Sequence, residues 1–353
     1  MGLRTYIAKR LINSLILIVL IICVNFAIFK LMPGDPTAFL MQAWSKEPPE
    51  VRRQQEQLIK SLWGLDQPFH IQLIKYIRNL LAWDFGVSII NKEPISHALG
   101  WRIPYTLLLI GGSTAVSIIL GVLLGIFVIQ RRGGLIDSAA VTTSLVLGSL
   151  PTFWLGLIFI LIFFVNLRWF PVAGGHPIWA RNYPVPWSYS VESSTNALNV
   201  NLSLNAMEAW RLVGGYLYHL FLPFLTLTVF SVGGWLLLTR ATMLETITED
   251  YVVTARAKGL KERTVLFKHA LKNASLPIIT SAALSFGFMF QGAIITETVF
   301  SYPGLGGYIW MAVQFLDYPV LMAIFYVTAL CVVIANIIAD LLYGVLDPRI
   351  KYG

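Results

Sequence analysis

The chain has 353 residues, of which 56% are hydrophobic and 12% are charged. A soluble globular domain carries about 25% charged residues, so this composition excludes an ordinary soluble protein and indicates one that lies in a bilayer. The formal net charge of +8 would suit a nucleic-acid partner if the charge were spread over the chain. Cys23 and Cys331 both lie in apolar runs and give neither a disulfide framework nor metal-ligand spacing.

Six apolar runs without a charged residue are long enough to cross a hydrocarbon core of about 30 Å. The first follows a short basic segment and is predicted to be a retained transmembrane helix, because Lys30 and a Pro-Gly-Asp-Pro stretch follow it in place of a cleavage site. The sequence therefore predicts an all-α polytopic membrane protein with six core transmembrane helices, over residues 11–29, 103–130, 138–166, 212–239, 275–296 and 318–339.

The distribution of charge predicts the orientation of these helices. If the N-terminus is cytoplasmic, the cytoplasmic segments hold 14 Lys/Arg and six Asp/Glu, with Asp340 counted not among these but at the inner end of the last span, and the longer outer segments hold 12 Lys/Arg and 11 Asp/Glu. The positive-inside rule then predicts that both termini are cytoplasmic. The whole surplus of positive charge lies on that side, so membrane topology accounts for the net charge of the chain. The sequence therefore predicts contact with membrane lipid and no binding of nucleic acid.

Three parts follow from this topology. Residues 1–32 are predicted to be the cytoplasmic N-terminus and first span, residues 33–102 an extracytoplasmic segment, and residues 103–353 the core domain. The apolar spacing in the second part predicts amphipathic helices that lie on the membrane or on the protein. In the second span, Gly121 and Gly125 form a small-xxx-small pair, for which packing within one subunit is favoured over a dimer contact.

Two long segments separate the later spans. Residues 167–211 are polar and rich in turns and aromatic residues, and they are predicted to be an extracytoplasmic loop insertion. Its aromatic side chains fit an interfacial belt, with a peptide- or sugar-contacting surface as the alternative. Residues 240–276 hold seven of the 26 Lys/Arg residues and are predicted to be a cytoplasmic loop. In that loop, Gly259 is predicted to end a helix, residues 262–272 to form a shorter one, and Pro277 to lie in the first turn of the next span.

The stretch TEDYVVTARAKGLKERTVLFKHALKNASLPIIT, residues 248–280, resembles the cytoplasmic "EAA" loop of ABC-importer permeases of the dipeptide/oligopeptide/nickel branch. It departs from that motif at Val253, where the family has an acidic residue, and Glu249 and Asp250 are the nearby acids. The resemblance implies a coupling helix that docks into an ATP-binding subunit. It assigns the docking surface to Thr254, Ala255, Arg256, Ala257, Lys258, Gly259, Leu260, Glu262 and Lys268.

Other stretches resemble the first-permease type of the same branch, among them MPGDP, LWGLDQP, WDFGVSI and the terminal YGVLDPRIKYG. In that branch the segment after the fifth span forms an outer re-entrant turn near the substrate entrance, which implies this place for Tyr302, Pro303 and Gly304. Polar groups at membrane depth are costly unless they face a cavity or a partner. We therefore expect a role in the translocation path, or alternatively helix-to-helix hydrogen bonding, for Met289, Gln291 and Glu297.

The resemblance implies the type I ABC importer permease fold in the plasma membrane of a prokaryote. Such a subunit forms half of the path for peptides or related solutes, such as oligosaccharides or nickel complexes. The implied partners are a second homologous permease in a heterodimer, two ATP-binding subunits and an external solute-binding protein. The chain has no GxxxxGK[ST] motif, so we expect no enzymatic activity and no bound cofactor or metal, with ATP and Mg²⁺ held by the partner subunits.

The alternative is a secondary carrier or channel that works without ATP. Carriers driven by ion gradients use charged relay residues within their spans. In this sequence Glu297 and Asp340, near the ends of predicted spans, are the candidates for such a role. The sequence therefore favours the permease subunit.

Overall fold

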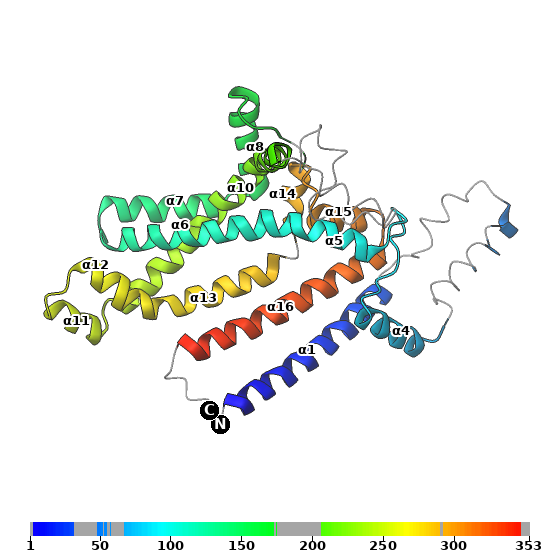
Figure 1. Cartoon of the computed structure of the whole chain (residues 1–353), viewed down its shortest axis with the longest axis horizontal. Coiled ribbons are helices and arrows are strands. Elements are labelled where there is room, and N and C mark those ends of the chain that lie inside the picture. Colours follow the sequence, from blue (N-terminus) through cyan, green and yellow to red (C-terminus); the bar gives the residue numbers. More distant parts are fainter. Residues whose placement is uncertain are drawn as a thin grey trace.

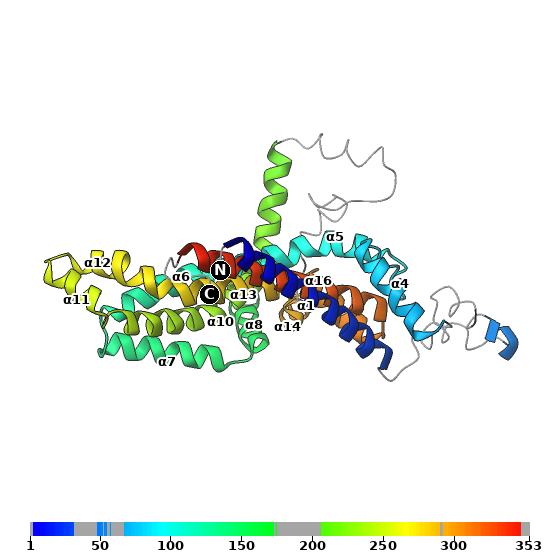
Figure 2. The ribbon, with the colours of Figure 1, turned by 90° about the horizontal axis from the view of Figure 1, so that it is seen from below.

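The computed structural model describes residues 3–31, 48–51, 53–54, 57, 67–172, 174, 206–289 and 292–346. These residues are mostly helical, as predicted, and no strand occurs among them, although an isolated bridge joins Val87 and Pro94. The described part is elongated. Helices α11 (Asp250–Ala257) and α12 (Glu262–Thr264) lie at one end and α4 (Phe69–Leu81) lies at the other (Figures 1 and 2).

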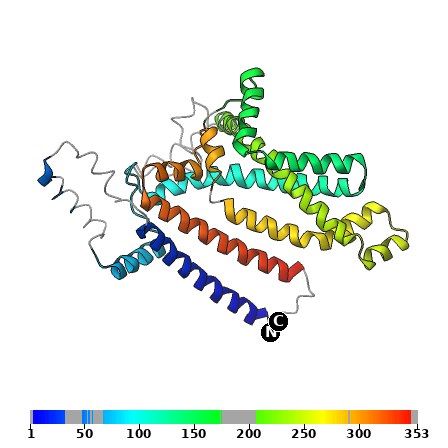
Figure 3. The ribbon, with the colours of Figure 1, turned by 180° about the vertical axis from the view of Figure 1, so that it is seen from behind.

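The first and last long helices lie side by side (Figures 1 and 3). They are α1 (Leu3–Leu31) and α16 (Tyr318–Leu346), each of 29 residues. At 1.5 Å per residue each is about 43 Å long, which exceeds the hydrocarbon thickness. Ile22 of α1 and Ile324 of α16 are both about 2% exposed and belong to one buried apolar cluster, so burial of these faces holds the two helices together.

The second long helix is built from α5 (Ile95–Thr106), the π-helical turn η1 (Leu107–Gly111) and α6 (Gly112–Ile129). Together they form one continuous apolar helix of 35 residues. It begins eight residues before the predicted span. The reason lies in Pro94, which stands just before the first helical residue, where a missing backbone N–H costs little.

Helix α10 (Ala206–Thr246) packs along α6. A Cβ atom on Gly125 would lie 2.7 Å from Cβ of Thr239, and one on Gly121 would lie 2.9 Å from the carbonyl oxygen of Val232. The two glycines thus allow the helix backbones to approach closely within one subunit, which confirms the favoured prediction for this pair.

The predicted third span is broken. Residues 138–166 form α7 (Leu135–Ser149) and then α8 (Thr152–Phe159) with η2 (Ile160–Asn166), and the two parts meet at an angle of 100°. The prediction of a single uninterrupted helix was wrong here. Leu150 is extended because it precedes Pro151, and the residue before a proline is disfavoured in the helical region.

The predicted fifth span is also divided. Helix α13 (Leu271–Phe288) ends before Gly292, whose φ is +73°, and α14 (Ile294–Val299) follows it. Gly292 approaches the backbone of Gly306 so closely that a Cβ atom would lie 2.6 Å from its Cα. Only glycine fits that approach. The chain then forms α15 (Leu305–Gln314) and enters α16.

The prediction that Pro277 opens the fifth span was wrong as well. Pro277 lies inside α13, because the helix that starts at Glu262 continues through η4 (Val265–Ala270) into α13. No glycine or proline occurs between Glu262 and Leu276 to stop it. The second helix of the polar loop and the following span are therefore one rod.

Candidate functional site: a polar loop and a re-entrant turn

We call residues 240–276 the polar loop. Its first helix, α11, starts after Glu249, which has an extended backbone (φ −69°, ψ 142°). The helix ends before Gly259, whose φ is +74° and whose N–H donates to the carbonyl oxygen of Arg256 at 2.9 Å. A left-handed residue just beyond a helix end favours glycine. The prediction that Gly259 ends this helix is confirmed.

The inner side of the polar loop has its own apolar core. Val252 and Ala255 of α11 are 0% and 5% exposed and pack with Val265 and Leu266 of η4. The same cluster includes side chains from the ends of two long helices, namely Ile126 and Ile129 of α6 with Met243 at the end of α10. The loop is thus fastened to these helices, and a force applied to it reaches three spans. Ala255 lies in this core and not on the outer surface.

The outer side of the loop carries the other residues that the resemblance assigned to docking. All are exposed: Thr254, Arg256, Ala257, Lys258, Gly259, Leu260, Glu262 and Lys268. Three apolar side chains are exposed beside these charges, with 53%, 40% and 40% of their surface accessible: Val253, Leu260 and Phe267. These three side chains are apolar surface that a docked partner would bury.

An ion pair joins the two helices across Gly259. Arg256 donates from Nε to Oε2 of Glu262 at 3.2 Å and from Nη2 to Oε1 at 2.8 Å. The hydrogen bond to the guanidinium holds the pKa of the Glu262 carboxyl below its usual range and raises the pKa of Arg256. Because both side chains are exposed, the pair contributes at most about 1 kcal/mol. Its role is to orient the turn.

Val253 stands where the family motif has an acid, and its side chain lies on the exposed side of α11. Glu249 and Asp250 stand at the start of the helix and are also exposed. A carboxylate there is stabilised by the helix dipole. These two acids therefore favour the start of α11 locally, at a different place from the motif's acid.

A second ion pair involves the first residue of the polar loop. Arg240 of α10 donates from Nε to Oδ1 of Asp137 at 2.6 Å and from Nη2 to Oδ2 at 2.8 Å, and the Gly133 N–H donates to Oδ2 at 2.9 Å. Asp137 is 4% exposed. The pair holds the turn between α6 and α7 against α10. Sequence reasoning missed it, because 103 residues separate the partners and the only signal was one charge at the edge of each apolar run.

At the other end of the fold, Glu297 of α14 is fully buried. Its carboxylate accepts the N–H of Gly307 at 3.0 Å, the N–H of Ala293 at 3.3 Å and the hydroxyl of Thr106 at 3.5 Å. A Cβ atom on Gly304 would lie 2.6 Å from the carboxylate, so the turn can wrap around it only with glycine there. These contacts correspond to hydrogen bonding within the protein, the second of the two roles expected for Glu297.

The other residues predicted near the entrance lie in the turn between α14 and α15. Tyr302 is 4% exposed, and its hydroxyl donates to the carbonyl oxygen of Tyr105 at 3.1 Å. Gly304 is buried and Pro303 is half-buried. The turn is thus fastened to α5. Among the predicted path residues, Met289 is half-buried beside η1 (its Sδ lies 3.3 Å from where a Cβ of Gly111 would be), and Gln291 lies outside the described residues.

A buried carboxylate that the sequence did not suggest ties the segment before α5 to the start of α16. Asp317 is fully buried, and its Oδ2 accepts the Ser88 hydroxyl at 2.6 Å and the Ile90 N–H at 3.3 Å. Nothing in the pattern pairs these residues, since 229 positions separate Asp317 from Ser88. The contact fixes the end of the 33–102 segment to the core.

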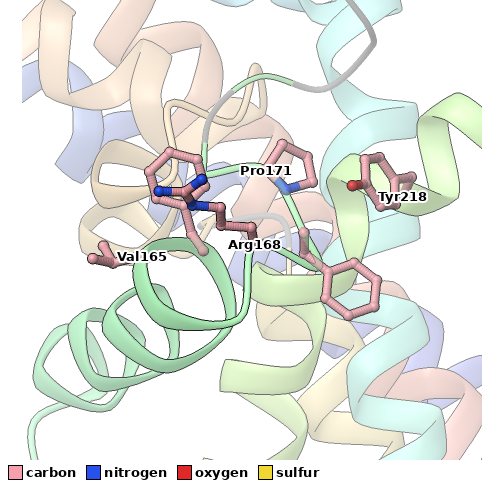
Figure 4. A pocket seen from close by; sticks show the side chains of 6 residues that line it. Val165, Arg168, Pro171 and Tyr218 are labelled. Carbon is pink, nitrogen blue, oxygen red and sulfur yellow. The ribbon is translucent and has the colours of Figure 1, made fainter.

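A cavity of about 420 Å³ lies between the end of η2 and α10, lined by Phe164, Val165, Arg168, Phe170, Pro171 and Tyr218 (Figure 4). Arg168 is the cationic side chain among these mostly apolar ones.

In the parts of the chain that the structure describes, no cluster of three His, Cys, Asp or Glu side chains could hold a metal ion.

Long apolar helices with a basic loop fastened to their ends are typical of a polytopic membrane protein. The chain matches the family "Binding-protein-dependent transport system inner membrane component" over residues 117–352, and the N-terminal region of such components over residues 3–110. It belongs to this family.

Relatives match along nearly the whole chain. The chain is 35% identical to the oligopeptide transport system permease protein AppB of Bacillus subtilis, over 98% of this chain and 99% of that one. It is 34% identical to the di/tripeptide transport system permease protein DppB of Pseudomonas aeruginosa, over 99% of each. The glutathione transport system permease protein GsiC of Salmonella paratyphi A is 31% identical, over 98% and 99%. The chain is therefore a permease subunit of an ABC importer and not an enzyme, since separate subunits hydrolyse ATP in these systems.

Proposed function

We propose that this chain is the first-type permease of a peptide importer in the bacterial plasma membrane, with six spans and both termini in the cytoplasm. The names of the relatives support peptides as the solute class. Oligosaccharides and nickel complexes are further solutes that only the resemblance of the polar loop to its branch implies. A second homologous permease completes the path, and an external binding protein delivers the solute. Two ATP-binding subunits hold ATP and Mg²⁺, and one of them docks on the polar loop of this chain.

The observation that carries this proposal is the two-sided construction of the polar loop. Its outer side presents Leu260 and Phe267 among lysine and arginine side chains, whereas its inner side is fastened to α6 and α10 and continues into α13. Closure of the ATPases then moves the loop and tilts these helices together. The loop must make different contacts with the ATPase in the two states, because only a difference in contact free energy shifts the equilibrium between them.

Replacement of Gly259 by tryptophan tests the docking. A Cβ atom on Gly259 meets no other atom within 4 Å, so the indole has room to extend outward, and the positive φ adds backbone strain at the turn. We expect Gly259→Trp to leave the subunit in the membrane. Capture of the ATPase and ATP-dependent peptide uptake should both fall by about tenfold or more, because a loss of about 1.4 kcal/mol in binding free energy lowers the affinity tenfold. The measurements are pull-down of the ATPase and uptake of labelled peptides into vesicles.

Two controls separate bulk from strain. Gly259→Asn keeps a small side chain that tolerates positive φ, so it is expected to dock normally. Thr248→Trp adds the same bulk at an exposed position in the turn before α11 and is expected to be milder. Normal capture and uptake for Gly259→Trp would contradict the proposal. Ala255→Arg is not suitable, because it would place a charge in the loop core.

The orientation has its own test. A cysteine at Thr264, in the polar loop, should react with an impermeant maleimide only after the membrane is opened. A cysteine at Asp84, in the segment between α1 and α5, should react in intact cells. Both positions lie in polar surroundings and are at least partly exposed. The opposite labelling pattern would overturn the proposed orientation.

A further inference from the structure

Helix α4 packs on one end of the first long helix, α1. It contacts the end of α1 that is farther from the N-terminus (Figures 1 and 3). Phe26 of α1 stacks on Tyr76 with ring centroids 5.5 Å apart, and Asn25 donates to the Tyr76 hydroxyl at 3.0 Å. These α1 residues lie about 22 Å along the helix from Leu11, where its apolar run begins. In a core of about 30 Å, that height is close to the far boundary.

One face of α4 is occupied by protein. Leu80 is 2% exposed and belongs to the apolar cluster that joins α1, α5 and α16, and Tyr76 and Ile77 pack against it. On another face, Ile74 and Leu81 stand seven residues apart, which is two helical turns, and are 64% and 72% exposed. A helix with an uncovered apolar stripe beside its buried face is unusual in water.

The remaining face of α4 is polar, with Lys75 and Asn79 four residues apart and both exposed. Arg78 lies between this face and the apolar stripe. The helix contains no acidic residue. Trp83 follows directly, 51% exposed, with its ring 5.1 Å from that of Phe85. Cationic side chains next to an apolar stripe, followed by a tryptophan, match a helix that lies in a membrane surface.

The apolar stripe also agrees with the surroundings of α1. That helix exposes Ile16, Val19 and Leu20, with 61%, 49% and 58% of their surface accessible. In a helix that crosses a bilayer, such a face contacts lipid chains. The helix on which α4 packs therefore has a face suited to lipid.

We propose that α4 is an interfacial helix. Ile74 and Leu81 rest among the outermost acyl carbons of the leaflet at this end of α1, and Arg78 binds the phosphate of an anionic phospholipid. The helix thereby holds the 33–102 segment at a constant height above the core. This goes beyond the proposed function and rests on it only for naming this leaflet the outer one.

Spin labels on single cysteines test the proposal in the assembled importer, with Cys23 and Cys331 replaced by alanine and the complex in phospholipid nanodiscs. Labels at Ile74 and Leu81 are expected to collide with oxygen several-fold more than with a water-soluble nickel chelate. A label at Asn79, on the polar face, is expected to show the reverse. Equal exposure to the chelate at all three positions would overturn the proposal.

Two further arms identify the occupant. Arg78→Glu should raise the Ile74 label toward water more in nanodiscs that contain phosphatidylglycerol than in pure phosphatidylcholine, because the phosphate of phosphatidylcholine is balanced by its choline cation. No change in either lipid would overturn the phosphate contact. Protection from the chelate that appears only after the external binding protein is added would assign the stripe to that protein and overturn the lipid assignment. Peptide uptake measured on the same preparation tests the proposed function separately.

Discussion

Replacement of Gly125 by leucine is expected to prevent stable assembly of this subunit in the membrane. A Cβ atom at this position would already lie 2.7 Å from Cβ of Thr239 and 3.1 Å from the carbonyl oxygen of Leu236. A backbone carbonyl cannot move aside as a flexible side chain can, so α6 and α10 would have to separate along their contact. Overpacking of a well-packed interior costs about 1–3 kcal/mol or more. Leucine adds four carbon atoms, so we expect the destabilisation to lie at the upper end of this range.

The measurement is the yield of monodisperse subunit and its unfolding temperature in detergent. Gly234→Leu is the matched control, because Gly234 lies on the same helix pair and a Cβ atom there meets no atom within 4 Å. We expect the control to resemble the wild type and Gly125→Leu to lose most of its folded fraction. Equal stability of the two variants would mean that the α6–α10 contact is looser than described.

Replacement of Glu297 by alanine is expected to unfasten the re-entrant turn. The N–H groups of Ala293 and Gly307 would lose their acceptor in a fully buried site. A buried donor that loses its acceptor costs about 1–3 kcal/mol, so the loss of the acceptor for both N–H groups is expected to lower the stability by about 2–6 kcal/mol. Glu297→Gln keeps one carbonyl acceptor and should fall between alanine and the wild type.

The same variants decide between the two roles expected for Glu297. If the carboxylate fastens the turn, Glu297→Ala lowers the unfolding temperature and increases labelling of a cysteine introduced at Tyr302, which is 4% exposed in the wild type. A variant with wild-type stability and labelling that still fails to transport peptides would instead assign Glu297 to the translocation path.

Much of the helical architecture follows from local rules. The apolar runs at 103–130 and 318–339 form most of two long helices, because an apolar run of that length must pair its backbone groups within itself. Gly259 ends a helix because glycine alone adopts a positive φ without strain. Gly121 and Gly125 lie one turn apart in α6, so their spacing predicts a helix face without side chains. Helix α10 packs against that face. Each of these features depends on residues a few positions apart.

The interrupted helices were harder to predict. Leu150 and Pro151 lie in an apolar run whose hydropathy predicts one continuous helix. The helix breaks there because the proline disfavours the helical conformation of Leu150. Gly292 needs its positive φ because the backbone of Gly306, from a later segment, lies against it. Hydropathy measures transfer to lipid and is insensitive to such contacts, so runs 138–166 and 275–296 each appeared to be one helix.

Sequence alone determined the class of this protein, the number of apolar runs, the polar loop and its glycine turn, because composition and short-range backbone preferences control them. Only the tertiary structure decided which loop residues face inward, so that Ala255 proved to be part of the loop core whereas Leu260 and Phe267 are exposed. It also paired Asp137 with Arg240 and Ser88 with Asp317, and it buried Glu297 in a turn. These pairings depend on how helices distant in sequence pack, and a buried charge selects its partner by proximity in space.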